Sequence, residues 1–127
     1  MPQKKIYIID DDPIYKLVTN KLIKKTNLFS ETRDFSNGSE ALNYFESTTD
    51  FPDILLLDLE MPEMDGWEFL EEFCQLKKKM DNFGIIYIAS SSIALEDKVK
   101  AQKYKCVRDF LSKPINLDKL KKIADQE

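Results

Sequence analysis

The sequence contains no histidine and only two cysteines among its 127 residues. Without histidine the chain cannot build the histidine-containing zinc sites or the catalytic Cys–His pairs found in many enzymes. The two cysteines, Cys74 and Cys106, lie far apart in the sequence, and neither has another cysteine nearby. We therefore expect two reduced, partly buried thiols without a redox role.

Long apolar runs are also missing. No run approaches the roughly 20 residues of a membrane-spanning helix, and the N-terminus (MPQKKIYIID) lacks the features of a signal peptide, so we expect a cytoplasmic protein. Glycine and proline are scarce, with three and five residues, and no repeat or low-complexity tract is visible. Because 127 residues is the size of one ordinary domain, we expect a single domain over residues 1–127 without an output domain.

Five short segments rich in apolar and β-branched residues predict strands. Two of them, ILLLD and IIYIA, are almost continuously apolar, which is typical of strands covered by helices on both faces. The predicted strands are residues 5–10, 32–35, 54–58, 85–89 and 107–111.

Between these segments, apolar residues recur with helical spacing. The stretch 95–104 has only Leu95 and Val99 as clear apolar anchors. Strand and helix alternate five times with short connections, which predicts an α/β fold with a doubly wound parallel sheet between two helical layers. The residues expected to share a helix face are Ile14, Leu17, Val18 and Leu22; Gly38, Ala41, Leu42 and Phe45; Phe69, Leu70, Phe73 and Cys74; and Leu117, Leu120 and Ala124.

Carboxylates gather at the ends of two predicted strands. Asp10 and Asp11 come at the end of the first, and Asp58 ends the third. In doubly wound sheets the binding crevice lies beyond the carboxyl ends of the strands, where the winding direction reverses. If the first and third strands flank that point, the three side chains meet there. Carboxylates 4 Å apart repel by roughly 4 kcal/mol per pair, so the cluster should hold a cation. Mg²⁺ suits such oxygen ligands, and Lys113 after the fifth strand can add positive charge.

Asp12, the third carboxylate of the DDDP stretch, is expected to cap a helix and not to bind metal. Asp12 precedes Pro13, and this pair is typical of a helix N-cap followed by proline at the first helical position. Asp65 and Gly66 predict a turn before another helix, and Asn116 offers a further cap.

Four separated motifs, IIDDDP, ILLLDLEMPEMDGWEFL, IIYIASSS and DFLSKP, resemble in order and spacing the response-regulator receiver domain of two-component signalling. The resemblance runs from Ile6 to about Ala124. It implies a flavodoxin-like, five-stranded parallel sheet of order 2-1-3-4-5 with five helices. It also implies a stand-alone phosphoacceptor switch, similar to single-domain chemotaxis regulators, that catalyses only its own phosphorylation and dephosphorylation.

The resemblance assigns roles to the acidic residues. Asp58 resembles the phosphoacceptor, which takes a phosphoryl group from a phosphohistidine of a partner. Asp11 resembles the direct metal ligand, and Asp10 its neighbour that acts through metal-bound water. Asp58 and the backbone carbonyl of Glu60 would complete the protein ligands of Mg²⁺, for which Mn²⁺ is a substitute. The Glu60 side chain either influences water attack on the phosphoryl group or is only a solvated loop residue.

Further switch residues follow from the same resemblance. Lys113 resembles the lysine that contacts the phosphoryl oxygens, and its bond to Pro114 is expected to be cis. Phe110 resembles the aromatic residue that changes rotamer on activation. The switch hydroxyl is Ser90 when the fourth strand is aligned forward and Ser91 when the spacing is counted back from Lys113; we take Ser90 first, with Ser91 in reserve.

The resemblance implies a histidine kinase or a histidine phosphotransfer protein as phosphoryl donor. It places the output surface at about residues 95–126, the fourth helix, fifth strand and fifth helix. Residues 98–127 carry a net charge of +5 and residues 1–97 one of −9, so this surface could steer an acidic partner or could simply be solvated helix faces. We expect an output protein whose identity the sequence does not give, no direct nucleic acid or membrane contact, and a monomer or weak phosphorylation-dependent dimer.

Three other functions are compatible with parts of the sequence. DDDPI loosely resembles the start of haloacid-dehalogenase-type phosphatases, with Asp10 as nucleophile and Asp12 as acid/base, although Ile14 departs from that motif. A flavodoxin-like electron carrier would want a Ser/Thr/Gly-rich phosphate loop where the three aspartates stand. A phosphorylation-independent docking module would have no use for the carboxylates and Lys113.

Overall fold

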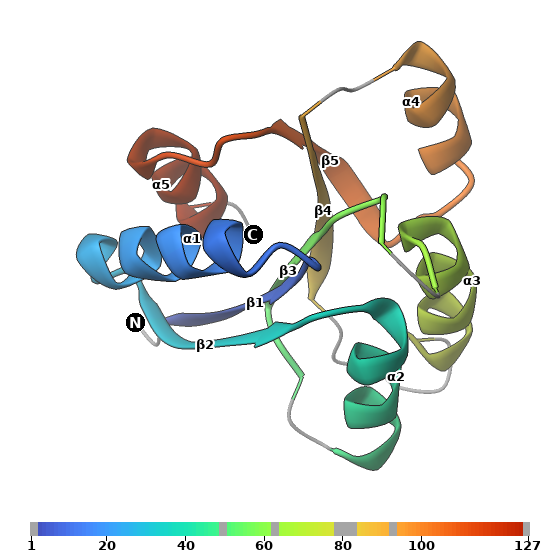
Figure 1. The fold of residues 1–127 in the computed structure, drawn as a ribbon, viewed down its shortest axis with the longest axis horizontal. Helices are drawn as coiled ribbons and strands as arrows, with labels where there is room; N and C mark the ends of the chain where they lie inside the picture. Colours follow the sequence, from blue (N-terminus) through green and yellow to red (C-terminus); the bar gives the residue numbers. More distant parts are fainter. Residues whose placement is uncertain (1–2, 49–50, 62–63, 78–83, 92–93, 126–127) are drawn as a thin grey trace.

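The computed structural model describes residues 3–48, 51–61, 64–77, 84–91 and 94–125. These residues form one parallel sheet of order β2-β1-β3-β4-β5 with helices on both faces (Figure 1), so the predicted doubly wound α/β fold is confirmed. The strands are β1 (Lys4–Ile9), β2 (Phe29–Phe35), β3 (Ile54–Leu57), β4 (Ile85–Ser90) and β5 (Val107–Ser112). The helices are α1 (Pro13–Thr26), α2 (Gly38–Ser47), α3 (Gly66–Lys77), α4 (Leu95–Ala101) and α5 (Leu117–Asp125).

The sheet divides the core into two halves because successive strand side chains point to opposite faces. In β1, Tyr7 and Ile9 pack into the cluster formed with α2 and α3, whereas Ile6 and Ile8 pack with α1 and α5. Figure 1 shows α1 and α5 on one side of the sheet and α2 and α3 on the other. All four side chains are fully buried, which explains the continuous apolar character of the central strands. No helix of the described ranges has the length and apolar character to cross a bilayer.

Strand β2 is longer than the sequence predicts. It begins at Phe29 instead of Thr32, and its register with β1 is irregular between Lys4 and Lys5. It is an edge strand, and of its seven residues only Phe35 is buried. Polar side chains are tolerated on such an edge, so an apolar pattern does not reveal the whole strand.

The apolar face expected in α1 is not the buried one. Ile14, Leu17 and Val18 are exposed, Ile14 by 71%, whereas Lys16, Thr19 and Ile23 are buried. Of the expected face, only Leu22 packs against the core.

Helix α4 also departs from its predicted anchors. It covers seven residues instead of the stretch 95–104, and both Leu95 and Val99 are exposed. Ala101 in its last turn is the buried residue. A small residue at this position lets the helix end lie against the core, which the apolar pattern did not indicate.

The predicted caps are confirmed. The Asp12 carboxylate accepts hydrogen bonds from the amides of Ile14 (2.9 Å) and Tyr15 (3.2 Å), and Pro13 begins α1. The side chain of Asn116 accepts one from the amide of Lys119 (2.9 Å) at the start of α5. These bonds satisfy amides that have no partner within the helix.

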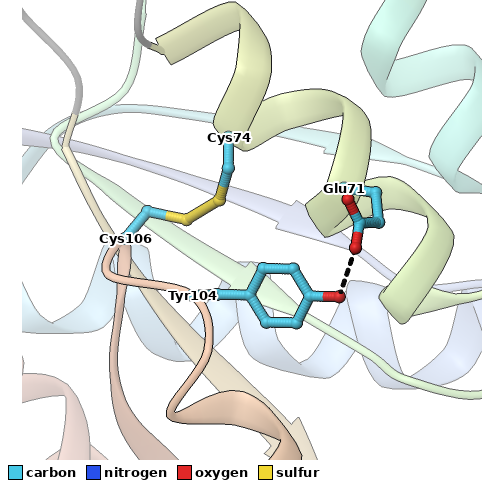
Figure 2. Close-up of a disulfide and its surroundings, with 4 residues drawn as sticks. All are labelled: Glu71, Cys74, Tyr104 and Cys106. Carbon is cyan, nitrogen blue, oxygen red and sulfur yellow. Dashed lines mark hydrogen bonds between the residues drawn. A yellow bond between two sulfur atoms is a disulfide. The ribbon is translucent and has the colours of Figure 1, made fainter.

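The expectation for the cysteines is wrong. Cys74 of α3 and Cys106, the residue before β5, are joined by a disulfide (Figure 2), and no described cysteine is free. Their Cα atoms lie 6.7 Å apart although 32 positions separate them in the sequence. The parallel crossovers bring the end of α3 beside the start of β5, a proximity that spacing along the chain cannot reveal.

Candidate functional site

Neighbouring central strands place the carboxylates at one edge of the sheet. Ile9 of β1 pairs with Leu57 of β3. Asp10 and Asp58 are the next residues along the chain, so they lie side by side at the ends of these two strands. Backbone bonds extend this pairing: the amide of Asp58 donates to the carbonyl of Ile9 (2.9 Å), and the amide of Asp10 donates to the carbonyl of Phe35 (3.1 Å). The backbone beneath both carboxylates is therefore held by the sheet.

Asp10, Asp11 and Asp58 form a compact acidic cluster. Each offers an oxygen, and these three oxygens all lie within 4.8 Å of one another. Asp10 is 1% exposed and Asp58 is 8% exposed, whereas Asp11 faces solvent. Hard oxygen donors at this separation fit Mg²⁺ or Mn²⁺, which bind through one or two carboxylates and keep other positions for water and phosphate oxygens. The residues present thus fit the expected metal.

Lys113 supplies the positive charge of the cluster from the turn after β5. Its Nζ lies 2.7 Å from Oδ2 of Asp10 and 3.4 Å from Oδ1 of Asp58. Its amide donates to the carbonyl of Ser90 (2.9 Å), and its bond to Pro114 is cis. The turn is therefore tied to the end of β4 while the ammonium points at the carboxylates.

The electrostatics of the cluster are dominated by burial. Burial, and after it the charge of Asp10, raises the pKa of the Asp58 carboxyl to about 6, although Lys113 opposes part of this rise. Burial lowers the pKa of Lys113, but the hydrogen bond and charge of Asp10, together with Asp58, outweigh it and raise that pKa above its ordinary value. A raised pKa keeps Lys113 charged at neutral pH.

The ring of Tyr15 in the first turn of α1 lies under the Lys113 ammonium. Nζ is 4.3 Å from the ring centroid, within the range of a cation–π contact. The hydroxyl of Tyr15 is buried and has no hydrogen-bond partner in the described part of the chain. The ring itself is therefore what Tyr15 offers to the site.

A surface cavity of about 620 Å³ opens beside the cluster. Ser90, at the end of β4, lines this cavity, whereas Ser91 is exposed and is not among its lining residues. Trp67 is half-buried and also lines the cavity, whereas Phe69 and Phe73, expected to share a helix face, are buried in the core. The lining residues are Asp11, Leu59, Glu60, Met61, Asp65, Trp67, Ser90 and Asp97.

Gly66 fixes the loop that carries Glu60. Its amide donates to the carbonyl of Leu59 (2.9 Å), and a Cβ at this position would come within 2.7 Å of the Asp58 carbonyl oxygen and 2.8 Å of Leu59 Cα. Only glycine permits this close approach of helix and loop. Asp65, the residue before Gly66, forms a capping box with Glu68: the backbone amide of each donates a hydrogen bond to the side-chain carboxylate of the other. This pair stabilises the start of α3.

Residues 6–125 match the family model described as response regulator receiver domain. The chain belongs to this family. Receiver domains are signalling modules of response regulators, and the acidic cluster is of the kind at which they typically bind Mg²⁺.

Several known proteins resemble this receiver domain. The chemotaxis protein CheY of Listeria monocytogenes is 29% identical over 116 residues, which are 91% of this chain and 91% of that protein. A solved two component response regulator from Cytophaga hutchinsonii has a TM-score of 0.87 at 28% identity, covering 97% of this chain and 95% of that one. A protein-glutamate methylesterase/protein-glutamine glutaminase of Treponema denticola is 35% identical over 118 residues, which are 90% of this chain. The chain spans only 29% of the length of that relative.

The structure of the receiver domain brings together most residues singled out in the sequence, but not all. Asp10, Asp58 and Lys113 are in contact, and Ser90 lines the adjoining cavity. Phe110 lies in β5, half-buried against the core cluster on the α3 side, and is not among the residues that line the cavity. Sequence reasoning missed Tyr15; its position in the first turn of α1 is the signal that could have placed it over the strand ends.

Proposed function

We propose that this chain is a phosphoacceptor signalling switch in which Asp58 takes a phosphoryl group from a phosphohistidine of a histidine kinase or histidine phosphotransfer protein. The observation that carries this proposal is the position of Asp58, in one oxygen cluster with Asp10 and Asp11 and 3.4 Å from Nζ of Lys113. Positioning and charge neutralisation are the main requirements of phosphoryl transfer, and this cluster offers both.

Each side chain has a distinct part in the proposed transfer. An ionised Asp58 oxygen attacks the phosphorus, forming the O–P bond as the N–P bond of the phosphohistidine breaks. Asp11 and the backbone carbonyl of Glu60 would bind the metal directly, and Asp10 would act through its water. A bound Mg²⁺ supplies neutralisation and orientation of the phosphoryl oxygens. Lys113 then pairs with the new phosphoryl charge, since its ammonium already lies between Asp10 and Asp58.

The proposed switch starts at the cavity and ends at the output surface. The aspartyl phosphate adds about −1.5 to −2 of charge, and the Ser90 hydroxyl, on the rim of the same cavity, can donate to it. Rearrangement of Ser90, with a rotamer change of Phe110 in β5, would alter the surface of α4, β5 and α5, about residues 95–126. Residues 126–127 lie outside the described part of the chain.

We further propose that residues 1–127 act as one receiver domain in the cytoplasm and pass the signal by contact with a protein partner. The partner would bind the surface of α4, β5 and α5 without direct contact to nucleic acid or membrane. The chain would be a monomer or a weak dimer formed on phosphorylation.

Incubation with Mg²⁺ and a small phosphodonor such as acetyl phosphate tests the proposal. Intact mass under conditions that preserve acyl phosphates should show one phosphoryl group on the wild type and none on Asp58→Asn, with the label mapped to Asp58 after borohydride trapping. A wild type without adduct would support a phosphorylation-independent docking module instead. Label on Asp10 would support the phosphatase-like alternative.

A pull-down tests the switch itself. A partner retained only after phosphorylation should be lost with Asp58→Asn and weakened with Lys113→Ala. Regulated binding that survives in Asp58→Asn would contradict the mechanism, because that variant has no carboxylate to phosphorylate.

A further inference from the structure

A second chemical site lies on the side of the molecule where α3 meets the loop between α4 and β5. Cys74 and Cys106 are joined there by a disulfide, and beside it the hydroxyl of Tyr104 donates to Oε1 of Glu71 (3.0 Å), as Figure 2 shows. None of these four residues takes part in the proposed phosphoryl transfer to Asp58.

Aromatic contacts extend this junction toward α4. The rings of Trp67 in α3 and Tyr104 in the loop are stacked with centroids 6.1 Å apart, and Nζ of Lys100 in α4 lies 4.7 Å from the Trp67 ring centroid. Helix α4 and the loop that follows it therefore contact α3 through three non-covalent contacts and one covalent bond.

The disulfide is open to small molecules from one side. A surface cavity of about 610 Å³ adjoins both sulfur-bearing residues and is lined by Glu71, Cys74, Gln75, Lys103, Tyr104, Lys105 and Cys106. Cys106 is only 3% exposed, whereas Cys74 is half-buried and thus the more accessible of the two. Lys103 and Lys105 add positive charge to the lining; nearby lysines favour the thiolate form of cysteine and attract anionic reagents.

We infer that Cys74 and Cys106 are a reversible oxidation site that locks α3 to the α4–β5 loop, with an anionic low-molecular-weight disulfide as its oxidant. The pair needs no phosphorylation of Asp58 to react, so it constitutes a second input to the domain. Disulfides that form and break under changing redox conditions act in this way in redox-sensing proteins.

The reaction is two successive exchanges. The thiolate of Cys74 attacks one sulfur of the small disulfide, RSSR, which breaks its S–S bond, releases one RS⁻ and leaves R–S on Cys74. The thiolate of Cys106 then attacks the Cys74 sulfur, forms the Cys74–Cys106 bond and releases the second RS⁻. The cysteine pair loses two electrons, which reduce RSSR to two RSH, and the protons of the two cysteines end on the two RS⁻ groups.

Oxidation restrains the segment that leads from α4 into the sheet. The carbonyl of Cys106 accepts a hydrogen bond from the amide of Ile86 in β4 (3.0 Å), so Cys106 is fixed at the base of β5. The intervening turn is held by backbone hydrogen bonds from the amide of Tyr104 to the carbonyl of Ala101 (3.0 Å) and from the amide of Val107 to the carbonyl of Tyr104 (3.1 Å). A bond to α3 adds a covalent restraint on this turn and, through it, on the end of α4.

Mass spectrometry of the purified chain tests the chemistry. Protein reduced with dithiothreitol should contain two alkylatable thiols; after oxidised glutathione it should contain none and show the mass loss of two hydrogen atoms, as a monomer. Cys106→Ser should stop at the first exchange and retain one glutathione on Cys74, whereas Cys74→Ser should react at least about tenfold more slowly because Cys106 is buried. Two alkylatable thiols in the oxidant-treated wild type, or only intermolecular disulfides, would overturn the inference.

Hydrogen exchange tests the lock without any substitution. The amides of Tyr104 and Val107 should exchange about tenfold or more slowly in the oxidised wild type than in the reduced one, while the amides of β1 do not change. A Cys74→Ser/Cys106→Ser double variant should exchange like the reduced wild type under both conditions. If the amides of Tyr104 and Val107 exchange at equal rates in the two redox states of the wild type, the disulfide does not restrain this turn, even if it forms. Phosphoryl uptake at Asp58 is measured separately, so the two proposals fail independently.

Discussion

The ammonium of Lys113 lies 2.7 Å from Oδ2 of Asp10, although 103 positions separate the two residues in the sequence. Both side chains are largely removed from solvent, with 18% and 2% of their surfaces exposed. Removal of either partner of such a buried ion pair is destabilising. The remaining charge would be shielded from water and would have no opposite charge to offset its desolvation. The pair thus ties the turn after β5 to the end of β1.

Replacement of Lys113 by alanine should raise the pKa of Asp58 above its value of about 6, by roughly one pH unit or more, because the lysine is the group that lowers it. The same variant should lose about 3 kcal/mol of unfolding free energy at neutral pH, since Asp10 is left buried and unpaired. Side-chain carboxyl NMR through a pH titration gives the first quantity and urea unfolding the second. Lys121→Ala, which removes an exposed lysine of α5, is the matched control and should change neither. A pKa of Asp58 that does not rise in Lys113→Ala would contradict this account.

The raised pKa of Asp58 makes stability depend on pH in a defined window. In the unfolded chain the carboxyl loses its proton near its ordinary pKa of 3.8, whereas the folded protein keeps the proton up to about pH 6. The folded state therefore binds more protons between these values, and the contribution of Asp58 to the unfolding free energy falls by about 2–3 kcal/mol as pH rises through the window. Above it the contribution is constant. Urea unfolding in the presence of a chelator should detect this fall.

Asp58→Asn isolates that contribution, because the amide cannot ionise. Without Mg²⁺ the variant should be more stable than the wild type by about 2–3 kcal/mol at pH 8, and the difference should shrink toward pH 4. A variant that is less stable than the wild type at pH 8 would mean that the ionised carboxylate is stabilised by its surroundings, contrary to its burial beside Asp10.

Much of the site was predictable because strand ends bring residues together by topology alone. Once the first and third strands of a parallel, doubly wound sheet are neighbours, Asp10 and Asp58 end adjacent strands, and their proximity follows from the apolar runs before them. The order of the strands came from resemblance to the receiver family and is confirmed. The phosphoacceptor, metal and switch roles of the individual residues stay predictions.

The errors share a physical cause, which is that they concern contacts between elements. Cys74 and Cys106 lie on different elements, and only packing reveals that their Cα atoms approach to 6.7 Å. The apolar spacing of α1 identified a row of apolar residues on one helix face, but that face is not the one that packs on the sheet. Ile14 and Leu17 are exposed, whereas Lys16 is buried and donates a hydrogen bond to the hydroxyl of Ser36 (3.0 Å). A helix above a sheet edge can bury the stem of a lysine, so polarity alone misassigned the inner face.

Addition of Mg²⁺ should stabilise the protein through Asp11 and not through its neighbour Asp12. At a concentration of about 100 times Kd, a ligand specific for the folded state adds about 2.7 kcal/mol to the unfolding free energy. Asp11→Asn should abolish most of this increment. Asp12→Asn removes an equal charge one residue away but keeps an oxygen that can accept from the amides of Ile14 and Tyr15, so it should retain the increment. If both variants lose the Mg²⁺-dependent increase in unfolding free energy equally, that increase comes from general attraction between Mg²⁺ and negative charge and not from binding by Asp11.

Substitution of Gly66 by alanine should disturb the loop that carries Glu60, because the new Cβ would meet backbone atoms of Asp58 and Leu59. We expect a loss of about 2–3 kcal/mol in urea unfolding together with a weaker response to Mg²⁺. Gly38→Ala is the matched control, since Gly38 also begins a helix after a capping residue. Its Cβ would meet side-chain atoms only, the flexible end of Met64 at 3.0 Å and Cβ of Phe69 at 3.2 Å, so its effect should be smaller, about 1 kcal/mol. Similar losses of unfolding free energy in both variants would contradict the claim that the close contact of Gly66 with the backbone of Asp58 and Leu59 requires glycine.

Tyr15 should act on the site through its ring and not through its hydroxyl. The ring centroid lies 4.3 Å from Nζ of Lys113, whereas the hydroxyl is buried without a hydrogen-bond partner in the described residues. Tyr15→Phe should therefore keep the wild-type rate of phosphorylation by acetyl phosphate and lose no stability. Tyr15→Leu keeps the apolar bulk but removes the π face, so the rate should fall about tenfold, the equivalent of about 1.4 kcal/mol, at the same Mg²⁺ concentration.

The comparison of Tyr15→Leu with Tyr15→Phe separates positioning of Lys113 from mere filling of space. If the ring holds the ammonium between the carboxylates, Tyr15→Leu should also raise the pKa of Asp58, because a less restrained Lys113 stabilises the carboxylate less. A residue that only fills space would change the unfolding free energy and leave that pKa where it is. An unchanged Asp58 pKa and an unchanged rate in Tyr15→Leu would together reject a positioning role for the ring.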